Sequence, residues 1–169
     1  MICKTGFGGS CHWCTEAIFS SLKGVLNVEQ GWIASDDAND YFSEAVIVKY
    51  DTAAISLETL IAIHLHTHSC TSKHSMRSKY RSAVYTFDQA QADQSTNIIR
   101  QLQRDFDQPI ITGVLAFKAF QLNKADYLNY YYSNPDKPFC KNIINPKLQE
   151  LMRRFSDQVE MKDKMDVLT

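Results

Sequence analysis

The sequence contains no run of about 18 consecutive apolar residues, the length that a membrane-spanning helix requires, so a transmembrane protein is excluded. Neither sign of charge dominates, because 18 basic and 19 acidic side chains leave a formal net charge of -1. This balance provides no electrostatic attraction for nucleic acid or for an anionic membrane. Repeats and low-complexity linkers are lacking, and the segment before Gly6 is too short for a signal peptide. We therefore expect one cytoplasmic domain, residues 1–169.

Cysteine is present, but the odd number of five cysteines fits no disulfide framework. In a reducing compartment, cysteines are more often buried apolar side chains, metal ligands or catalytic thiols than structural bridges. The five lie at positions Cys3, Cys11, Cys14, Cys70 and Cys140.

Hydrophobic periodicity predicts an alternation of strands and helices along the chain. The order β-α-β-β-α-β-α-β, followed by helices, indicates an α+β fold. We expect a two-layer sandwich with a ferredoxin-like β-α-β-β-α-β unit and C-terminal helices. The expected strands are 2–7, 25–34, 41–50, 82–87 and 110–120, and the expected helices are 13–23, one beginning at Ser56, 88–106, 125–132 and one beginning at Pro146.

A glycine-rich turn leads directly into Cys11, and Cys11 opens a segment with helical spacing. Glycines permit a tight backbone and leave room for a substrate to approach. A cysteine in the first turn of a helix meets the positive end of the helix dipole, which favours the thiolate. Cys11 is therefore a candidate nucleophile.

Five segments, in the same order along the chain, closely resemble motifs of the A-type peptide methionine sulfoxide reductases. The first is the glycine turn with Cys11, which is similar to the family's Gly-Cys-Phe-Trp and a nearby glutamate. The five segments are Gly6–Phe19, Gly31-Trp32, Ser43–Asp51, Tyr80–Tyr85 and Asn134-Pro135 with Cys140 and Pro146-Lys147.

The resemblance implies reduction of methionine sulfoxide, free or in peptides, with a preference for the S epimer. It implies that Cys11 attacks the sulfoxide sulfur and becomes a sulfenic acid. Glu44 is then the acid that protonates the oxygen, since burial among apolar groups favours a protonated carboxyl. Tyr80 donates a hydrogen bond to the oxygen, and Trp13, His12 and Trp32 line the pocket for the substrate methyl group.

Two cysteines are candidates for resolving the sulfenic acid. The resemblance favours Cys140, which matches the family's recycling position, and Cys14 is the alternative. Cys14 completes a Cys-x-x-Cys sequence with Cys11 at a helix start, a spacing that redox disulfides use. The resemblance implies thioredoxin or another thiol as reductant, no metal and no other cofactor. We expect a monomer that binds neither nucleic acid nor membrane.

The sequence also departs from the family pattern. His12 stands where the family has phenylalanine, and its polar ring either weakens capture of the methyl group or donates to the oxygen. Trp32 replaces a tyrosine, and the loop 71–79 is short and lacks a family aspartate. One alternative is therefore a relative that binds sulfoxide or senses redox state without efficient turnover. A second alternative is a metal-binding protein, because the segment 64–74 is rich in potential ligands, His64, His66, His68, Cys70 and His74.

Overall fold

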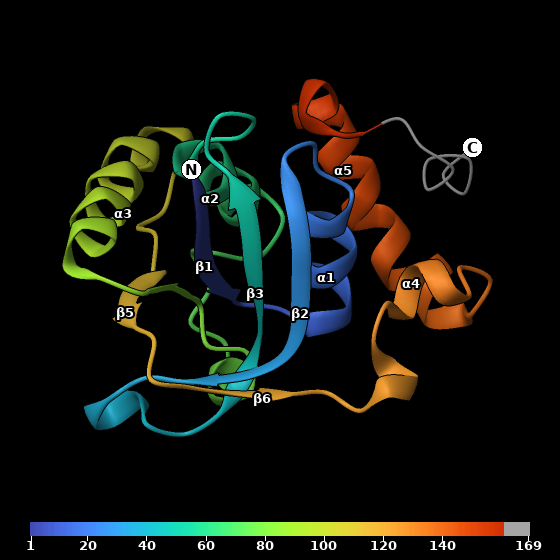
Figure 1. Ribbon diagram of the computed structural model, residues 1–169, viewed down its shortest axis with the longest axis horizontal. Coiled ribbons are helices and arrows are strands. Elements are labelled where there is room, and N and C mark those ends of the chain that lie inside the picture. The colour runs from blue at the N-terminus through green and yellow to red at the C-terminus, as the bar shows by residue number, and fades with distance from the viewer. Residues whose placement is uncertain (161–169) are drawn as a thin grey trace.

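A computed structural model of the protein describes residues 1–160. Six strands form one mixed sheet in the order β5-β4-β1-β3-β2-β6 (Figure 1). The strands are β1 Ile2–Gly8, β2 Val25–Ala34, β3 Ser43–Asp51, β4 Ala83–Thr86, β5 Gly113–Ala116 and β6 Ala119–Leu122. The α-helices are α1 His12–Ser20, α2 Leu57–His66, α3 Gln89–Leu102, α4 Tyr130–Ser133 and α5 Asn145–Phe155.

The central strands confirm the predicted ferredoxin-like unit. In the order β4-β1-β3-β2, each strand is antiparallel to its neighbours, with α1 and α2 as the two crossovers. Ser56 caps α2 as expected, because its side chain accepts a hydrogen bond from the Thr59 N–H group. The α+β fold predicted from periodicity is therefore confirmed.

The expected single strand 110–120 is wrong, because this segment forms two short strands at opposite edges of the sheet. β5 runs parallel to β4, and β6 pairs with β2. Phe117 and Lys118 alone connect them, and their N–H groups donate to Thr86 and Ala34. Three residue steps span at most about 11 Å. The sheet must therefore curl until its edges approach each other at this end.

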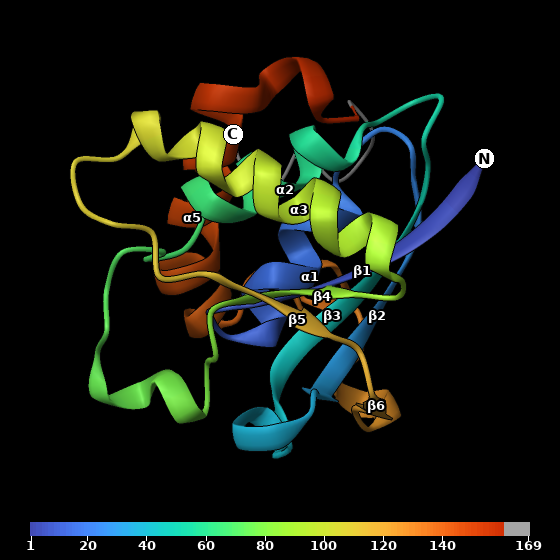
Figure 2. The same cartoon turned by 90° about the vertical axis from the view of Figure 1, so that its left-hand side faces the viewer.

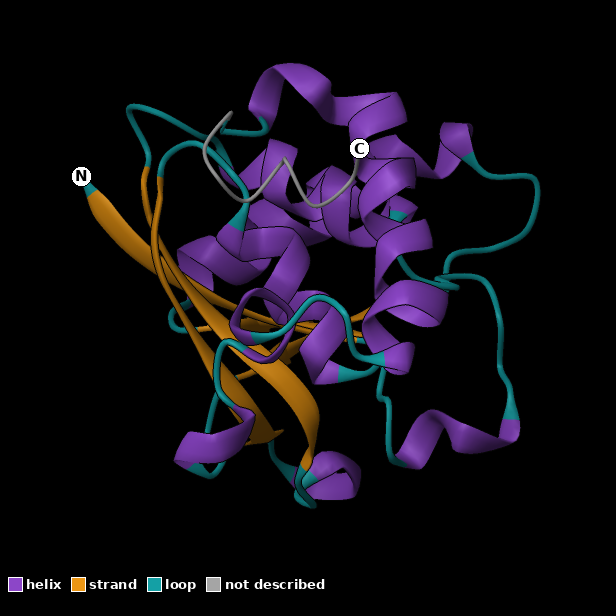
Figure 3. Ribbon diagram, turned by 90° about the vertical axis from the view of Figure 1, so that its right-hand side faces the viewer, coloured by secondary structure: helices purple, strands orange, loops and turns teal. Residues whose placement is uncertain are grey.

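The α-helices cover one face of the sheet, which makes the fold a two-layer sandwich (Figure 3). The main core lies between the layers and combines residues of β1, β3 and β4 with α1, α2 and α5. Figure 2 shows α3 beside α2, and its apolar residues pack against the same core. A smaller cluster fills the concave side of the curled sheet with Ile33, Ala45, Ile47, Ala83 and Tyr85.

The segment after β6 is less helical than predicted. A 3-10 turn, Ala125–Tyr127, is followed by α4, a single short turn. Asn129, which lies between them, adopts the left-handed conformation with φ 53°, so a continuous helix is interrupted. A π-helical turn, Cys140–Ile144, leads into α5, whose first turn contains Pro146 as expected. Between residues 1 and 160, no helix is long and apolar enough to cross a membrane.

Candidate active site

The glycine turn delivers Cys11 to the start of α1. β1 ends at Gly8, and Gly9 follows with φ +151°, a conformation that side chains other than hydrogen rarely adopt. A Cβ atom at Gly9 would lie 2.5 Å from Cδ2 of His68, so the histidine ring also requires glycine here. α1 begins at His12, which makes Cys11 its N-cap residue.

The electrostatic surroundings of Cys11 favour its thiolate. The thiol of Cys14 donates a hydrogen bond to Cys11, and this is the largest influence that lowers the pKa of Cys11. The N–H groups of Trp13 and Cys14 act in the same direction, while burial and the Glu44 carboxylate oppose them. The same thiol–thiol hydrogen bond, together with burial, raises the pKa of Cys14. The thiolate therefore forms more readily at Cys11 than at Cys14.

Cys11 opens into a cavity of about 440 Å³ that also contains Tyr80. Cys14 and Phe139 contribute to the same lining. The cavity forms where the glycine turn and α1 meet the segment before β4 and the π-helical turn. The structure therefore brings together two of the residues predicted for catalysis, Cys11 and Tyr80, although they are far apart in the sequence.

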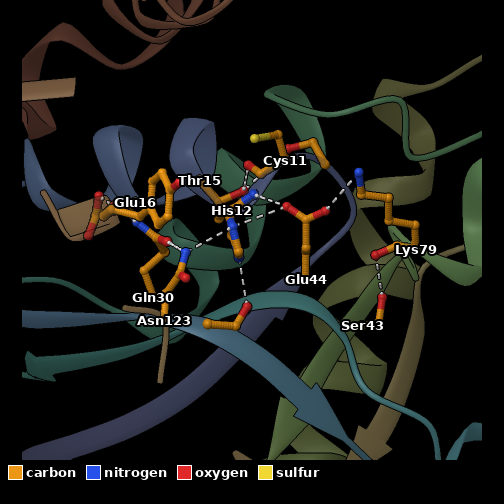
Figure 4. Close-up of polar contacts among 12 residues, drawn as sticks. Cys11, His12, Thr15, Glu16, Gln30, Ser43, Glu44, Lys79 and Asn123 are labelled. Atoms are coloured by element: carbon orange, nitrogen blue, oxygen red, sulfur yellow. Dashed lines mark hydrogen bonds and ion pairs between the residues drawn. The ribbon is translucent and has the colours of Figure 1, made fainter. Parts of the chain in front are cut away.

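Glu44 is buried at the start of β3 and, unlike Cys11 and Tyr80, does not line the cavity. It is only 5% exposed, and Val46 and Val48 on the same face of the strand belong to the main core. Its Oε1 atom accepts a hydrogen bond from the His12 backbone N–H at 3.3 Å (Figure 4). Lys79 Nζ lies 3.7 Å from Oε2. The carboxyl thus has an apolar wall on one side and polar neighbours on the other.

His12 and Trp32 lie next to Glu44. Trp32 is the direct cross-strand neighbour of Glu44 in the pairing of β2 with β3. The two rings of His12 and Trp32 meet edge to face at a centroid distance of 5.1 Å. His12 Nε2 is 3.3 Å from Glu44 Oε1, and His12 Nδ1 is 2.8 Å from the Gly31 carbonyl.

Trp13 lies in an aromatic stack rather than against an open pocket. The Tyr130 ring covers it at a centroid distance of 3.9 Å and an interplanar angle of 5°. Tyr127 stacks at 5.7 Å, and Phe139 contacts it edge to face at 5.5 Å. The segment after β6 therefore covers the indole, and Phe139 forms the aromatic wall of the cavity instead.

Cys140 is fully buried in the π-helical turn, and burial raises the pKa of its thiol. Its neighbours Phe139 and Ile143 line the cavity of Cys11, whereas Cys140 does not. All five cysteines are free thiols. Of the two candidates for resolving the sulfenic acid, Cys14 is the one in contact with Cys11.

Arg77 organises the short loop before β4, a role that the sequence analysis did not assign. Its guanidinium donates to the Gly9 and Tyr80 carbonyls at 2.8 and 2.9 Å. It also donates to the carbonyls of Ser72 and Ser69, at 2.8 and 2.5 Å. Arg77 thereby ties the turn before Cys11 to Tyr80. A guanidinium suits this role because its several N–H donors can reach several carbonyls at once. The sequence carries no signal for the role, because the loop 71–79 departs from the family pattern and contains no motif.

The histidine-rich segment has a structural role at the glycine turn. The rings of His64 and His68 stack at 4.2 Å, and His68 Nε2 is 2.8 Å from the Ser82 hydroxyl. Burial lowers the pKa of His68 to about 3, and it lowers the pKa of His64 well below its usual value. Within residues 1–160, no group of three or more His, Cys, Asp or Glu side chains is arranged to hold a metal ion.

A thiol with a lowered pKa, held at a helix start beside a cavity, is the arrangement of enzymes that use cysteine as a nucleophile. We therefore class the chain as a thiol-dependent enzyme.

Comparison with known proteins identifies the family. A family model described as peptide methionine sulfoxide reductase matches residues 3–159. A peptide methionine sulfoxide reductase MsrA of Trichodesmium erythraeum is 36% identical over 168 residues, which cover 90% of this chain and 95% of the relative. The chain belongs to the peptide methionine sulfoxide reductase family.

Solved structures share the fold. The reduced form of Mxr1 from Saccharomyces cerevisiae has a TM-score of 0.73 at 18% identity, with 82% of this chain and 89% of that chain covered. Mxr1 in complex with Trx2 has a TM-score of 0.60 at 19% identity, with 76% and 84% covered. At these identities the likeness concerns the fold alone.

Proposed function

We propose that the protein reduces the S epimer of methionine sulfoxide, free or in peptides, with Cys11 as the nucleophile. Membership of the family supports the reaction, and one observation supports the nucleophile. That observation is the Cys11 thiol at the N-cap of α1, with its pKa lowered by the Cys14 thiol and with Tyr80 across the cavity.

In the proposed reaction, the Cys11 thiolate attacks the sulfoxide sulfur. The oxygen takes up a proton, and both the sulfur–oxygen bond of the substrate and the transient bond between the two sulfurs break. The oxygen is then bonded to the Cys11 sulfur as a hydroxyl. Methionine and a Cys11 sulfenic acid are the products, so the sulfoxide is reduced by two electrons and the cysteine is oxidised by two. The acid is needed because negative charge develops on the oxygen as the attack proceeds.

Glu44 is the proposed source of that proton, and Tyr80 the proposed hydrogen-bond donor to the oxygen. The buried position of the Glu44 carboxyl at the start of α1, with the His12 backbone N–H on its Oε1 atom, supports the first assignment. The position of Tyr80 in the cavity of Cys11 supports the second. We place the methyl group of the substrate against Phe139, with Trp13 behind it and with His12 and Trp32 towards Glu44.

For recycling, we propose that Cys14 forms the first disulfide with Cys11. The Cys14 thiol attacks the sulfenic sulfur, and water leaves with the former sulfoxide oxygen. The thiol–thiol hydrogen bond supports this order, while the buried Cys140 is the alternative and requires movement of the π-helical turn. A thiol such as thioredoxin would then reduce the disulfide, a proposal supported by the solved complex of Mxr1 with Trx2. The proposed cycle uses thiols alone, without a metal or other cofactor, and we propose that the protein acts as a monomer in the cytoplasm.

Mass spectrometry of separate S and R sulfoxide substrates tests the activity. With dithiothreitol as reductant, wild type should convert the S epimer, Cys11→Ser should convert neither, and Cys3→Ser should match wild type. Conversion by Cys11→Ser at the rate of wild type would overturn the assignment of the nucleophile.

Disulfide mapping after one turnover without reductant tests the recycling step. We expect a Cys11–Cys14 bond in wild type and in Cys140→Ser, and a lasting sulfenic acid in Cys14→Ser. A Cys11–Cys140 bond that forms at the wild-type rate in Cys14→Ser would instead assign the step to Cys140.

A further inference from the structure

A second cavity, of about 400 Å³, is lined by three basic side chains. They are Lys73 and Arg77 of the loop 71–79, and Arg81, which lies just before β4. Within residues 1–160, no aspartate or glutamate contributes to this lining. A cavity lined by charges of one sign attracts ligands of the opposite sign. We call it the basic cavity, and the proposed reaction does not yet give it a use.

Arg81 carries a buried charge that no carboxylate balances. The residue is only 6% exposed. Its guanidinium donates to the Tyr85 hydroxyl at 3.0 Å and to the carbonyls of Tyr41 and Ile33 at 3.1 and 2.9 Å. These neutral acceptors use three of its five N–H groups. Arg81 belongs to none of the ion pairs in the described part of the chain, and a buried charge without a partner is costly.

The surroundings of Arg81 compensate for only part of its charge. The guanidinium lies 4.7 Å from the ring centroid of Tyr41 and 5.5 Å from that of Tyr85, and such cation–π contacts are favourable. Burial raises the pKa of the Tyr85 phenol, although Arg81 opposes the shift, so the phenol is neutral near pH 7. The turn 36–40 contributes Asn39 to the lining but none of its aspartates. The basic cavity therefore remains open to an anion.

The basic cavity adjoins the cavity of Cys11. His74 lines both cavities. Arg77 lines the basic cavity, and its guanidinium donates to the carbonyls of Gly9 and Tyr80, which line the cavity of Cys11. A substrate whose sulfoxide lies beside Cys11 can therefore place a neighbouring group in the basic cavity.

We propose that the basic cavity binds a carboxylate of the substrate while the sulfoxide lies beside Cys11. The carboxylate accepts hydrogen bonds from the remaining N–H groups of Arg81, since a guanidinium matches the geometry of a carboxylate. Lys73 is exposed and adds a positive charge on the solvent side. The carboxylate is either an acidic side chain near methionine sulfoxide in a peptide or the α-carboxylate of free methionine sulfoxide. The inference rests on the proposed function, because it concerns the substrate of that reaction.

Two other lysines lie near Cys11 and also attract acidic substrates. Lys147 lines the cavity of Cys11, and its Nζ donates to the Thr67 carbonyl at 3.1 Å. Lys79 Nζ lies 3.7 Å from the Glu44 carboxylate. Attraction by these lysines does not depend on Lys73, so variants of Lys73 separate the basic cavity from a general preference for acidic substrates.

Blocked peptides that contain one methionine S-sulfoxide test the inference. One series carries a glutamate at successive positions on either side of the sulfoxide, and a matched series carries glutamine. We expect the kcat/KM of wild type to be at least about fivefold higher with glutamate than with glutamine at one or more positions. Lys73→Glu should abolish this gain, while Lys4→Glu, on β1 and outside both cavities, should keep it. The glutamine peptides should react alike in all three proteins.

Free methionine S-sulfoxide and its amide distinguish the two sources of the carboxylate. A loss of kcat/KM in Lys73→Glu that affects the free amino acid but not the amide assigns the site to the α-carboxylate. A loss that affects only the glutamate peptides assigns it to an acidic side chain. The inference is overturned if Lys73→Glu changes neither comparison by more than about twofold, or if Lys4→Glu causes an equal loss.

Calorimetric titration of Cys11→Ser with the same peptides measures binding without turnover. Tighter binding of a glutamate peptide, abolished when Lys73→Glu is added, would support the basic cavity even if wild type reduced no sulfoxide. Reduction of every peptide by wild type, with equal affinity for the glutamate and glutamine peptides, would leave the proposed function intact and overturn this inference. The two proposals can therefore fail separately.

Discussion

Replacement of Cys14 by alanine removes the hydrogen-bond donor that most strongly favours the Cys11 thiolate. A hydrogen bond to a charged group contributes about 1.5–3 kcal/mol, and each 1.4 kcal/mol is about a tenfold change in an equilibrium. Cys11 is half-buried, so solvent replaces part of the lost donor and the lower part of this range applies. We therefore expect the thiolate population of Cys14→Ala to fall about 10- to 30-fold on the acidic side of the titration.

The assay is the rate at which iodoacetamide alkylates Cys11 between about pH 5 and about pH 9, because only the thiolate reacts. Mass spectrometry of the peptide containing Cys11 separates its labelling from that of the other four cysteines. Cys14→Ser keeps an O–H donor and should give an intermediate rate. Cys140→Ser changes a cysteine outside the cavity and should match wild type.

Coincident rate profiles for Cys14→Ala and wild type would refute this reasoning. A similar loss in Cys140→Ser would refute it as well, since a general loosening of the site would then be the cause. A loss confined to Cys14→Ala and Cys14→Ser, in that order of size, is the predicted result.

Three further predictions concern the frame around Cys11. Burial lowers the pKa of His68 to about 3 and the pKa of His64 well below its usual value, so below about pH 6.5 the unfolded chain binds protons that the folded chain does not. The free energy of unfolding should therefore be greatest above that pH and fall towards pH 3, by about 2 kcal/mol at pH 5 for His68. Equal urea midpoints at pH 7 and pH 5 would contradict this. Arg77→Ala removes the guanidinium that donates to four backbone carbonyls, and it should speed hydrogen exchange in residues 69–80 and lower kcat/KM at least about tenfold. Unchanged exchange there would count against the assigned role. Gly9→Ala should cost about 1–3 kcal/mol of unfolding free energy, because the new Cβ meets the His68 ring at a strained φ, and an unchanged urea midpoint would exclude that contact.

The ferredoxin-like unit could be predicted from the sequence because each of its elements carries a local signal. The apolar run 45–48 within the strand and the cap at Ser56 depend only on neighbouring residues. The segment 110–120 is different, since one apolar run is divided between two edges of the sheet. That division depends on the curl of the whole sheet, and no local pattern records it.

The same distinction applies to the site. The position of Cys11 at a helix start could be predicted, because the glycine turn and the helical spacing adjoin it in the sequence. The cover over Trp13 comes from Tyr130, more than a hundred residues away, and could not be read from spacing. The contacts of Asn123 likewise join residues 93 and 111 positions apart. Such side chains carry no motif, and only the fold brings them together.

The most direct test of the central claim is a single-turnover reaction of wild type with the S epimer, followed by peptide mapping of the cysteines. We predict one equivalent of methionine for each protein molecule, with the oxidation found on Cys11 as a sulfenic acid or as a disulfide to Cys14 or Cys140. Production of methionine with Cys11 still present as a free, unmodified thiol would contradict the account.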